Sequence, residues 1–287
     1  MDGIVIVDKP QDWTSQDVVS KLRGVFQTRR IGHGGTLDPM ATGVLPVFVG
    51  RATRGVEFFE HAVKTYEAVL RLGVITNTED ITGEVLETRT VNITKDDFLS
   101  CLEDFRGEIQ QIPPMYSALK INGQKLCDLA RKGKEVARKP RTITIHKLEC
   151  LSFDGDTARL LVTCSKGTYI RTLCKDIGEA LGCGGCMEAL RRVGAGAYTI
   201  EEAVPLADLV ASDDPAKYLR PVDSMFTQYE AVTLTEKQSL RCRNGNSFSI
   251  HLPEGTYRAY DETGAFLMLA NVESGVMSTI KSFFSVE

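Results

Sequence analysis

The chain has 287 residues, of which 43% are hydrophobic and 25% are charged. These fractions are typical of globular proteins and exclude a collagenous, low-complexity or disordered chain. We find no export leader and no apolar run long enough to cross a membrane, so we expect a cytoplasmic protein. The formal net charge of -4 excludes nucleic-acid binding through overall charge alone.

Eight cysteines are present, at irregular spacing. Cys183 and Cys186 form a close pair, but neither a second pair nor a neighbouring histidine completes the four ligands of a structural zinc. In a large chain without a secretion signal, cysteines are more often reduced and half-buried. We therefore expect free thiols and no bound metal.

The first fifty residues predict a strand, a turn, a helix and a long loop. Residues 3–7 are a short apolar run, and Ser15 is placed to be the N-cap of a helix that carries Val18 and Leu22 at helical spacing. Residues 30–50 contain five glycines and two prolines and follow neither a strand nor a helix period. A long irregular loop inside a compact domain is usually functional.

The middle of the chain mixes strands with helices. Residues 65–72 alternate as a strand does and place Tyr66 on the apolar face. Thr94 and Asp97 predict a capping box that starts a helix, and a further helix is expected over 123–132.

Two more strands, over 142–145 and 158–163, precede a helix marked by Ile170, Leu173 and Ile177. This irregular order of strands and helices favours an α+β fold over a doubly wound parallel sheet.

Residues 205–221 are predicted to be a linker or a surface excursion. Beyond them, turn residues separate five short strands, over 231–234, 247–251, 256–260, 266–270 and 281–284. This spacing is typical of a small β-barrel or sandwich, and we place the domain boundary near Tyr229.

One stretch of the chain is strongly basic. It contains two acidic residues, Asp128 and Glu135, and eight basic ones: Lys120, Lys125, Arg131, Lys132, Lys134, Arg138, Lys139 and Arg141. An RNA backbone would find its counter-charges there, although a solvated helix and loop would have the same composition.

Asp38 is the leading candidate for catalysis, because a rigid loop rich in glycine and proline can hold a carboxylate against a substrate. A local Asp-Pro turn is the alternative. His33, in the same segment, is either a general base or an ordinary hydrogen-bonded residue. Arg171 opens a helix, where the dipole mildly disfavours a cation, so an anionic partner such as Asp38 is favoured over the alternative of an ordinary surface arginine. Neither a P-loop nor a dinucleotide fingerprint occurs.

Five separated segments, in this order and at this spacing, resemble the TruB family of tRNA pseudouridine synthases over nearly the whole chain. They are Asp8-Lys9-Pro10 with Trp13-Thr14-Ser15; Gly32-His33 to Leu37-Asp38-Pro39 with Ala41-Thr42-Gly43-Val44-Leu45-Pro46; Lys64-Thr65-Tyr66; Pro113-Pro114-Met115-Tyr116-Ser117-Ala118 with Asn122-Gly123; and Gly167-Thr168-Tyr169-Ile170-Arg171-Thr172. The tail resembles a PUA-type RNA-binding barrel.

The resemblance implies a pseudouridine synthase catalytic domain over 1–228, with a mixed, mainly antiparallel sheet flanked by helices and an RNA-binding insertion around 113–141. It implies a PUA-like domain over 229–287. The implied activity converts uridine to pseudouridine at position 55, in the T-loop of tRNA, without a metal or another cofactor. The implied partner is the T-arm and elbow of tRNA, and we expect the protein to act as a monomer.

For the residues, the resemblance implies that Asp38 is the catalytic carboxylate, that Tyr66 stacks on the flipped base, and that Arg171 pairs with Asp38. Asp38 would attack C1', add to C6 of the base or remove a sugar proton, and the residues do not decide between these routes.

The remaining implied roles are supporting ones. His33 would help to hold the T-loop, Tyr169 would contact the target nucleotide, and Leu190 would line the pocket. Lys9 and Pro10 would support the catalytic loop.

Three positions depart from the family pattern: Gly34 stands where threonine is frequent, Asp12 where glycine is usual, and Cys127 where tyrosine is frequent. Two rival functions remain. A tRNA-folding factor would bind the elbow without catalysis, and a glycosidase-like hydrolase would pair two carboxylates. No second acid lies near Asp38 in the sequence.

Overall fold

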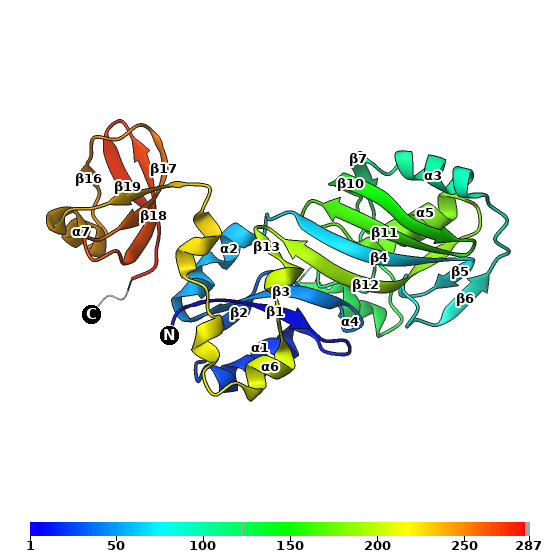
Figure 1. The fold of residues 1–287 in the computed structure, drawn as a ribbon. Coiled ribbons are helices and arrows are strands. Elements are labelled where there is room, and N and C mark those ends of the chain that lie inside the picture. The colour runs from blue at the N-terminus through cyan, green and yellow to red at the C-terminus, as the bar shows by residue number, and fades with distance from the viewer. Residues whose placement is uncertain (122, 285–287) are drawn as a thin grey trace.

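The computed structural model describes residues 1–121 and 123–284, so Asn122 of the fourth family-like segment lies outside the described residues. A ten-stranded sheet forms the larger part, and a five-stranded sheet built from the last sixty residues stands apart from it (Figure 1). The strands of the large sheet are β1 (Gly3–Lys9), β2 (Ile31–His33), β3 (Thr42–Val49), β4 (Lys64–Leu72), β7 (Gly107–Gln111), β10 (Arg141–Asp154), β11 (Thr157–Cys164), β12 (Gly185–Ala195), β13 (Tyr198–Thr199) and β14 (Val204–Pro205).

These strands follow the order β14-β1-β3-β12-β4-β11-β10-β7, with β2 beside β3 and β13 beside β12. The β1–β14 and β3–β12 pairs are parallel, and the other neighbouring pairs are antiparallel. The predicted α+β fold with a mixed, mainly antiparallel sheet is confirmed. Because β4 and β12 lie at the centre of the sheet, residues far apart in the chain meet there.

Helices pack against the large sheet and form separate hydrophobic cores at its two ends. Helix α1 (Ser15–Val25) packs Val18 and Leu22 against β1 and β3, while α3 (Lys95–Glu103) and α5 (Ile170–Ala180) pack on the strands at the other end (Figure 1). The predicted alternation of β4 is confirmed, with Leu70 fully buried. Each such leucine stabilises the fold by roughly 1.5–3 kcal/mol relative to an exposed one.

The N-cap of α1 is Thr14, so the prediction of Ser15 was wrong by one residue. Thr14 forms a capping box with Asp17, which satisfies backbone groups at the start of the helix. The Ser15 hydroxyl is buried and accepts a hydrogen bond of 2.8 Å from the backbone N–H of Leu37. Ser15 therefore ties α1 to the segment that contains Asp38.

The prediction of an irregular loop over 30–50 was also wrong for most of its length. Residues 31–33 and 42–49 form β2 and β3, which pair with each other, so the loop is confined to residues 34–41. Strand β3 is buried on both faces and therefore lacks the polar and apolar alternation that marks a half-buried strand.

Smaller differences concern helix lengths. The capping box of Thr94 and Asp97 is confirmed at the start of α3. The helix expected over 123–132 is only the short α4 (Leu126–Ala130). The expected linker over 205–221 contains α6 (Leu206–Ala211), whose leucines pack on the core beside β1.

The second sheet curls around its own core, as the predicted PUA-like barrel does. Its strands are β15 (Glu230–Thr233), β17 (Gly255–Tyr260), β18 (Phe266–Glu273), β19 (Val276–Ser282) and β16 (Phe248–Ser249), in spatial order. Helix α7 (Glu236–Arg243) was not predicted, although Thr235 and Gln238 form its capping box. None of the helices in residues 1–121 and 123–284 is both long and apolar enough to cross a membrane.

Aromatic residues join the second sheet to the larger part of the molecule. Phe226 lies 5.4 Å from Phe58 of α2 (Val56–Phe59) and 5.7 Å from Phe283, measured between ring centroids. Lys281 of β19 also forms an ion pair of 2.5 Å with Glu57. The contact is apolar at its centre and charged at its edge.

Candidate active site

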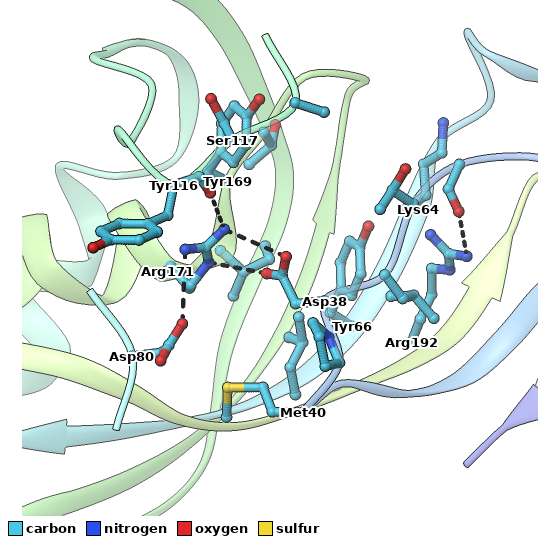
Figure 2. A pocket seen from close by; sticks show the side chains of 18 of the residues that line it. Asp38, Met40, Lys64, Tyr66, Asp80, Tyr116, Ser117, Tyr169, Arg171 and Arg192 are labelled. Carbon is cyan, nitrogen blue, oxygen red and sulfur yellow. Dashed lines mark hydrogen bonds and ion pairs between the residues drawn. The ribbon is translucent and has the colours of Figure 1, made fainter. Parts of the chain in front are cut away.

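A cavity of about 840 Å³ opens on the large sheet beside the loop of residues 34–41 (Figure 2). The sequence-predicted residues Asp38, Tyr66, Tyr169, Leu190 and Arg171 all line this cavity. They come from that loop, from β4, from β12 and from the start of α5. The fold therefore brings together residues that are up to 152 positions apart, from Asp38 to Leu190.

Asp38 and Arg171 form an ion pair at the centre of the cavity (Figure 2). The Arg171 Nε lies 2.9 Å from Asp38 Oδ2, and its Nη2 lies 3.4 Å from Oδ1, so the guanidinium engages both carboxylate oxygens. Arg171 also donates to the backbone carbonyls of Thr78, at 3.0 Å, and Tyr116, at 2.8 Å. Its side chain is only 6% exposed, whereas that of Asp38 is 37% exposed. A fixed cation thus orients a carboxylate that faces the cavity.

Burial raises the pKa of Asp38 above its ordinary value, with Arg171 opposing the rise and Asp80 adding to it. A carboxylate with a raised pKa is a stronger base than an exposed one. The arrangement therefore suits Asp38 to nucleophilic attack or to removal of a proton.

Asp80 is a second acid at this site, and the sequence did not indicate it. Its Oδ2 lies 3.7 Å from Arg171 Nη1. Its Oδ1 accepts hydrogen bonds from the hydroxyls of Thr78, at 2.9 Å, and Thr82, at 2.6 Å. Asp80 is therefore committed to holding Arg171, which distinguishes it from the second, free carboxylate of a hydrolase. Its place in a turn 42 residues from Asp38 gave no signal.

Glu79 locks this turn onto α5. Its carboxylate accepts hydrogen bonds from Thr172 Oγ1, at 2.5 Å, and from Lys175 Nζ, at 3.1 Å. Its φ of 65° is in the left-handed region, which costs a non-glycine residue roughly 1–2 kcal/mol. Side-chain contacts to α5 offset that strain and keep the neighbouring Asp80 against Arg171.

Lys9 anchors the loop of residues 34–41 that carries Asp38. Its Nζ donates to the carbonyls of Pro10, at 2.8 Å, Trp13, at 2.5 Å, and Pro39, at 3.2 Å. Lys9 is fully buried, and that burial lowers its pKa to about 8. Lys9 and Pro10 lie outside the cavity lining, and the loop-supporting role implied for them stays a prediction that this geometry favours.

Tyr66 and Arg192 face each other across the central strands. Arg192 of β12 is the cross-strand partner of Tyr66 of β4, and Leu190 is the partner of Ala68. Arg192 is 1% exposed, and its Nε and Nη2 donate to the carbonyls of Val44, at 2.6 Å, and Gly35, at 3.2 Å. Burial raises the pKa of Tyr66, and Arg192 opposes the rise. Arg192 was missed, although an arginine two residues after Leu190 falls on the same apolar strand face.

Gln111 positions Tyr169 at the start of α5. The Tyr169 N–H donates to Gln111 Oε1 at 2.8 Å, and Gln111 Nε2 donates back to the Tyr169 carbonyl at 3.1 Å. Gln111 is buried at the end of β7, and no sequence pattern had singled it out. Because the backbone of Tyr169 is clamped, its side chain has a defined direction along the cavity wall.

His33 does not line the cavity. It lies in β2, opposite Val47, and its Nδ1 is buried without a hydrogen-bond partner in the described residues. Burial lowers the pKa of His33, with Arg192 as the next cause. A neutral imidazole is therefore favoured, and the role implied for His33 in holding the T-loop stays a prediction.

Most of the predicted RNA-backbone residues are exposed: Lys120, Lys125, Arg131, Lys132, Lys139 and Arg141. Arg131 also lines the cavity, so the basic stretch reaches the site. Arg138 differs, because its side chain is 18% exposed and its Nη2 pairs with Glu135 at 3.0 Å. Arg138 is therefore less available to a phosphate than its neighbours.

The fold accounts for one of the three departures, Gly34. A Cβ at Gly34 would lie 2.5 Å from Phe59 Cδ1 and 3.0 Å from Phe48 Cε2, so a larger residue would have to displace the Phe59 ring. Asp12 has a φ of 65°, a conformation that glycine adopts without strain. Cys127 lines the cavity, and nothing in the structure explains its choice over tyrosine.

Two family models match the sequence. One describes the TruB family pseudouridylate synthase N-terminal domain and covers residues 23–170. The other describes the tRNA pseudouridylate synthase B C-terminal domain and covers residues 171–227. The chain belongs to the TruB family. The tRNA pseudouridine synthase B of Clostridium kluyveri is 41% identical over 289 residues, which cover 99% of this chain and 100% of that relative. The tRNA pseudouridine synthase B of Dechloromonas aromatica is 47% identical over 257 residues, which cover 89% of this chain and 85% of that relative.

Solved structures share the fold of this TruB family member. A Cbf5–Nop10–Gar1 complex contains a chain that matches with a TM-score of 0.75 at 25% identity, covering 99% of this chain and 85% of the other. An H/ACA RNP bound to a substrate RNA containing 2'-deoxyuridine gives a TM-score of 0.74 at 23% identity, covering 99% and 86%. Both matches extend over both sheets.

Proposed function

We propose that this chain isomerises uridine to pseudouridine in tRNA, at position 55 of the T-loop. The Asp38–Arg171 pair carries the proposal, because it holds a basic carboxylate in a cavity beside an aromatic ring, Tyr66. The family membership and the names of the relatives support the same reaction.

The proposed reaction leaves the composition of the nucleotide unchanged. The C1'–N1 bond breaks, the uracil rotates, a C1'–C5 bond forms, and the proton on C5 is lost while N1 gains one. A base inside a folded loop must be flipped out before these atoms become accessible. In our proposal the flipped base lies against Tyr66 and Leu190, Asp38 acts on it or on its sugar, and Tyr169 contacts the nucleotide.

Within this proposal, Arg171 is a positioning residue that keeps Asp38 directed at the substrate. Asp80 and Glu79 act through Arg171, because they hold it and its carbonyl acceptors in place. Asp38 could act at C1', at C6 or on a sugar proton, and an ionised carboxylate suits each of these three routes.

We further propose a catalytic domain over 1–228, with 113–141 as an RNA-binding insertion, and a PUA-like RNA-binding domain over 229–287. The second family model ends at residue 227, three residues before β15, which supports this division. The exposed lysines and arginines of 120–141 would bind the backbone of the T-arm and elbow. We propose a monomer that acts in the cytoplasm, where it would need neither a metal nor another cofactor.

Replacement of Asp38 tests the proposal. We expect Asp38→Asn to abolish pseudouridine formation while tRNA affinity stays within about tenfold, because one carboxylate contributes little to a phosphate-driven interface. The matched control is Asp96→Asn on the exposed surface of α3, which should keep full activity. Pseudouridine mapping on unmodified tRNA transcripts reports both activity and position. Product from Asp38→Asn would refute the catalytic role, and modification confined to the anticodon arm would refute the T-loop.

The same assay separates the two rivals. A folding factor would bind tRNA and form no product even as the wild-type chain. A hydrolase would release free uracil and lower the mass of the RNA, whereas isomerisation leaves the mass unchanged. The commitment of Asp80 to Arg171 argues against the hydrolase, which needs a second free carboxylate.

A further inference from the structure

Two buried cations line the cavity on the side of Tyr66 away from Arg171 (Figure 2). Lys64 starts β4 and is 8% exposed, and Arg192 of β12 is 1% exposed. Both lie beside Gly35: a Cβ built on that glycine would be 3.6 Å from Arg192 Nη1 and 4.0 Å from Lys64 Cε. Gly35 is therefore a neighbour of both cations on the cavity wall.

Neither cation forms a close ion pair with a carboxylate in residues 1–121 and 123–284, and Lys64 feels only the more distant carboxylate charge of Glu60. The three donors of Lys64 Nζ meet a single acceptor, the Glu60 carbonyl at 3.1 Å. Two of the five donors of Arg192 meet the carbonyls of Val44 and Gly35, and a further side-chain hydrogen bond joins Arg192 to Tyr66. Arg171, on the opposite side, has Asp38 and Asp80. The site therefore has a cation paired with two carboxylates on one side and two cations without a close ion pair on the other.

Uncompensated buried charge is costly, so it is normally retained where a ligand supplies the opposite charge. The mutual repulsion is visible in Lys64, whose pKa is lowered to about 8 by burial first and by Arg192 second. Asp38 does not neutralise this corner, because it is engaged by Arg171. An anion that enters the cavity with the substrate would accept hydrogen bonds from the donors of Lys64 and Arg192 that have no acceptor.

We propose that Lys64, backed by the charge of Arg192, binds a backbone phosphate of the RNA next to the flipped uridine. The proposal rests on the proposed function and names a part of its substrate. Lys64 contacts the phosphate, since it is the more exposed of the two cations. Arg192, held by its two carbonyls, supplies fixed positive charge beneath it. With the phosphate bound at Lys64 and the base lying against Tyr66 beside Asp38, the nucleotide is held at both ends and cannot rotate as a whole while the uracil does.

A methylphosphonate scan tests the proposal directly. Each phosphate around the target uridine of a T-arm hairpin is replaced in turn by a neutral methylphosphonate, and single-turnover pseudouridine formation is measured with the wild-type chain and with Lys64→Gln. We expect one phosphate at which neutralisation slows the wild-type chain by at least tenfold, as for loss of a charge-assisted hydrogen bond. With Lys64→Gln the same neutralisation should change the rate by less than about twofold, because its partner is already absent.

Two further variants control for folding and for general charge. Lys64→Arg keeps the cation and should retain the dependence on that phosphate. Lys95→Gln, on exposed α3, should give the wild-type scan. If Lys64→Gln slows every substrate equally, or slows none, the phosphate contact is refuted.

Failure of the proposed function would look different from failure of this contact. If the wild-type chain makes no pseudouridine, the same scan is read by RNA affinity. Suppose that neutralising one phosphate lowers the RNA affinity of the wild-type chain but not that of Lys64→Gln. That result would support the phosphate contact without supporting the proposed reaction. Equal affinity losses in both proteins at every phosphate would refute the contact.

Discussion

The loop of residues 34–41 and the basic stretch of residues 120–141 are both predicted to contact RNA, but they differ in how firmly the rest of the chain holds them. The loop is tied down by Lys9, by Ser15 and by Arg171, which reach it from three different elements. The basic stretch is mainly exposed and contains only the short α4. Chemistry requires a group fixed in position, whereas attraction to phosphates needs charge near a surface and tolerates motion. The comparison predicts large effects on catalysis from the loop and small effects on affinity from the stretch.

Arg171→Met should have the largest effect on the loop side. The variant keeps most of the apolar bulk but leaves Asp38 and Asp80 without their shared cation, so we expect activity to fall by at least about 100-fold. Arg171 holds the pKa of Asp38 down against burial, so its loss raises that pKa further. If the reaction needs an ionised Asp38, the acidic limb of the pH–rate profile should therefore move to higher pH.

The pH profile of single-turnover rates is the measurement, with Arg23→Met on exposed α1 as the control. An unshifted acidic limb would show that Arg171 does not set the protonation of Asp38.

Gly34→Ala tests whether packing behind the loop matters as much as the polar anchors. The new Cβ would meet Phe59 at 2.5 Å, and overpacking of this kind costs roughly 1–3 kcal/mol of the free energy of unfolding. Urea unfolding measures the cost. In a double-mutant cycle with Phe59→Leu, Gly34→Ala should cost less in the Phe59→Leu background than in the wild-type chain. Equal costs in the two backgrounds would place the strain elsewhere.

Lys132→Gln tests the expected contribution of the exposed basic stretch of residues 120–141 to tRNA affinity. Lys132 is exposed and makes no ion pair in the described part of the chain. Its loss should weaken tRNA binding by about threefold and reduce the slope of log affinity against log salt by about one, with an unchanged single-turnover rate at saturation. Filter binding at several salt concentrations measures both. A large fall in the saturated rate would mean that the stretch positions the substrate as firmly as the loop does.

Asp12→Gly should have the smallest effect. Relief of the left-handed conformation would stabilise the folded state by roughly 1 kcal/mol, and the greater freedom of glycine in the unfolded chain would cancel most of that gain. We expect Tm to change little and activity to be retained. Asp12→Ala, which keeps the strain, should be less stable than Asp12→Gly. If Asp12→Gly is clearly less stable than the wild-type chain, the Asp12 side chain contributes more than its backbone costs.

The sequence by itself determined the family and the fold class, and it identified five residues that line the cavity: Asp38, Tyr66, Tyr169, Arg171 and Leu190. Glycine, proline and the order and spacing of short motifs are local features, so Asp38, Tyr66 and Arg171 were identifiable before any contact was known. The alternation of β4 also predicted the burial of Tyr66, because side chains in a strand point to opposite faces in turn.

Only the tertiary structure decided which groups complete the site. Asp80, Gln111 and Arg192 lie in segments without a motif, and each matters because a strand or turn from elsewhere brings it to the cavity. Gly34 likewise has its explanation in Phe59, 25 positions away. Contacts between distant segments depend on register and packing, which local patterns do not encode, and so the partners of the catalytic loop were visible only once the chain was folded.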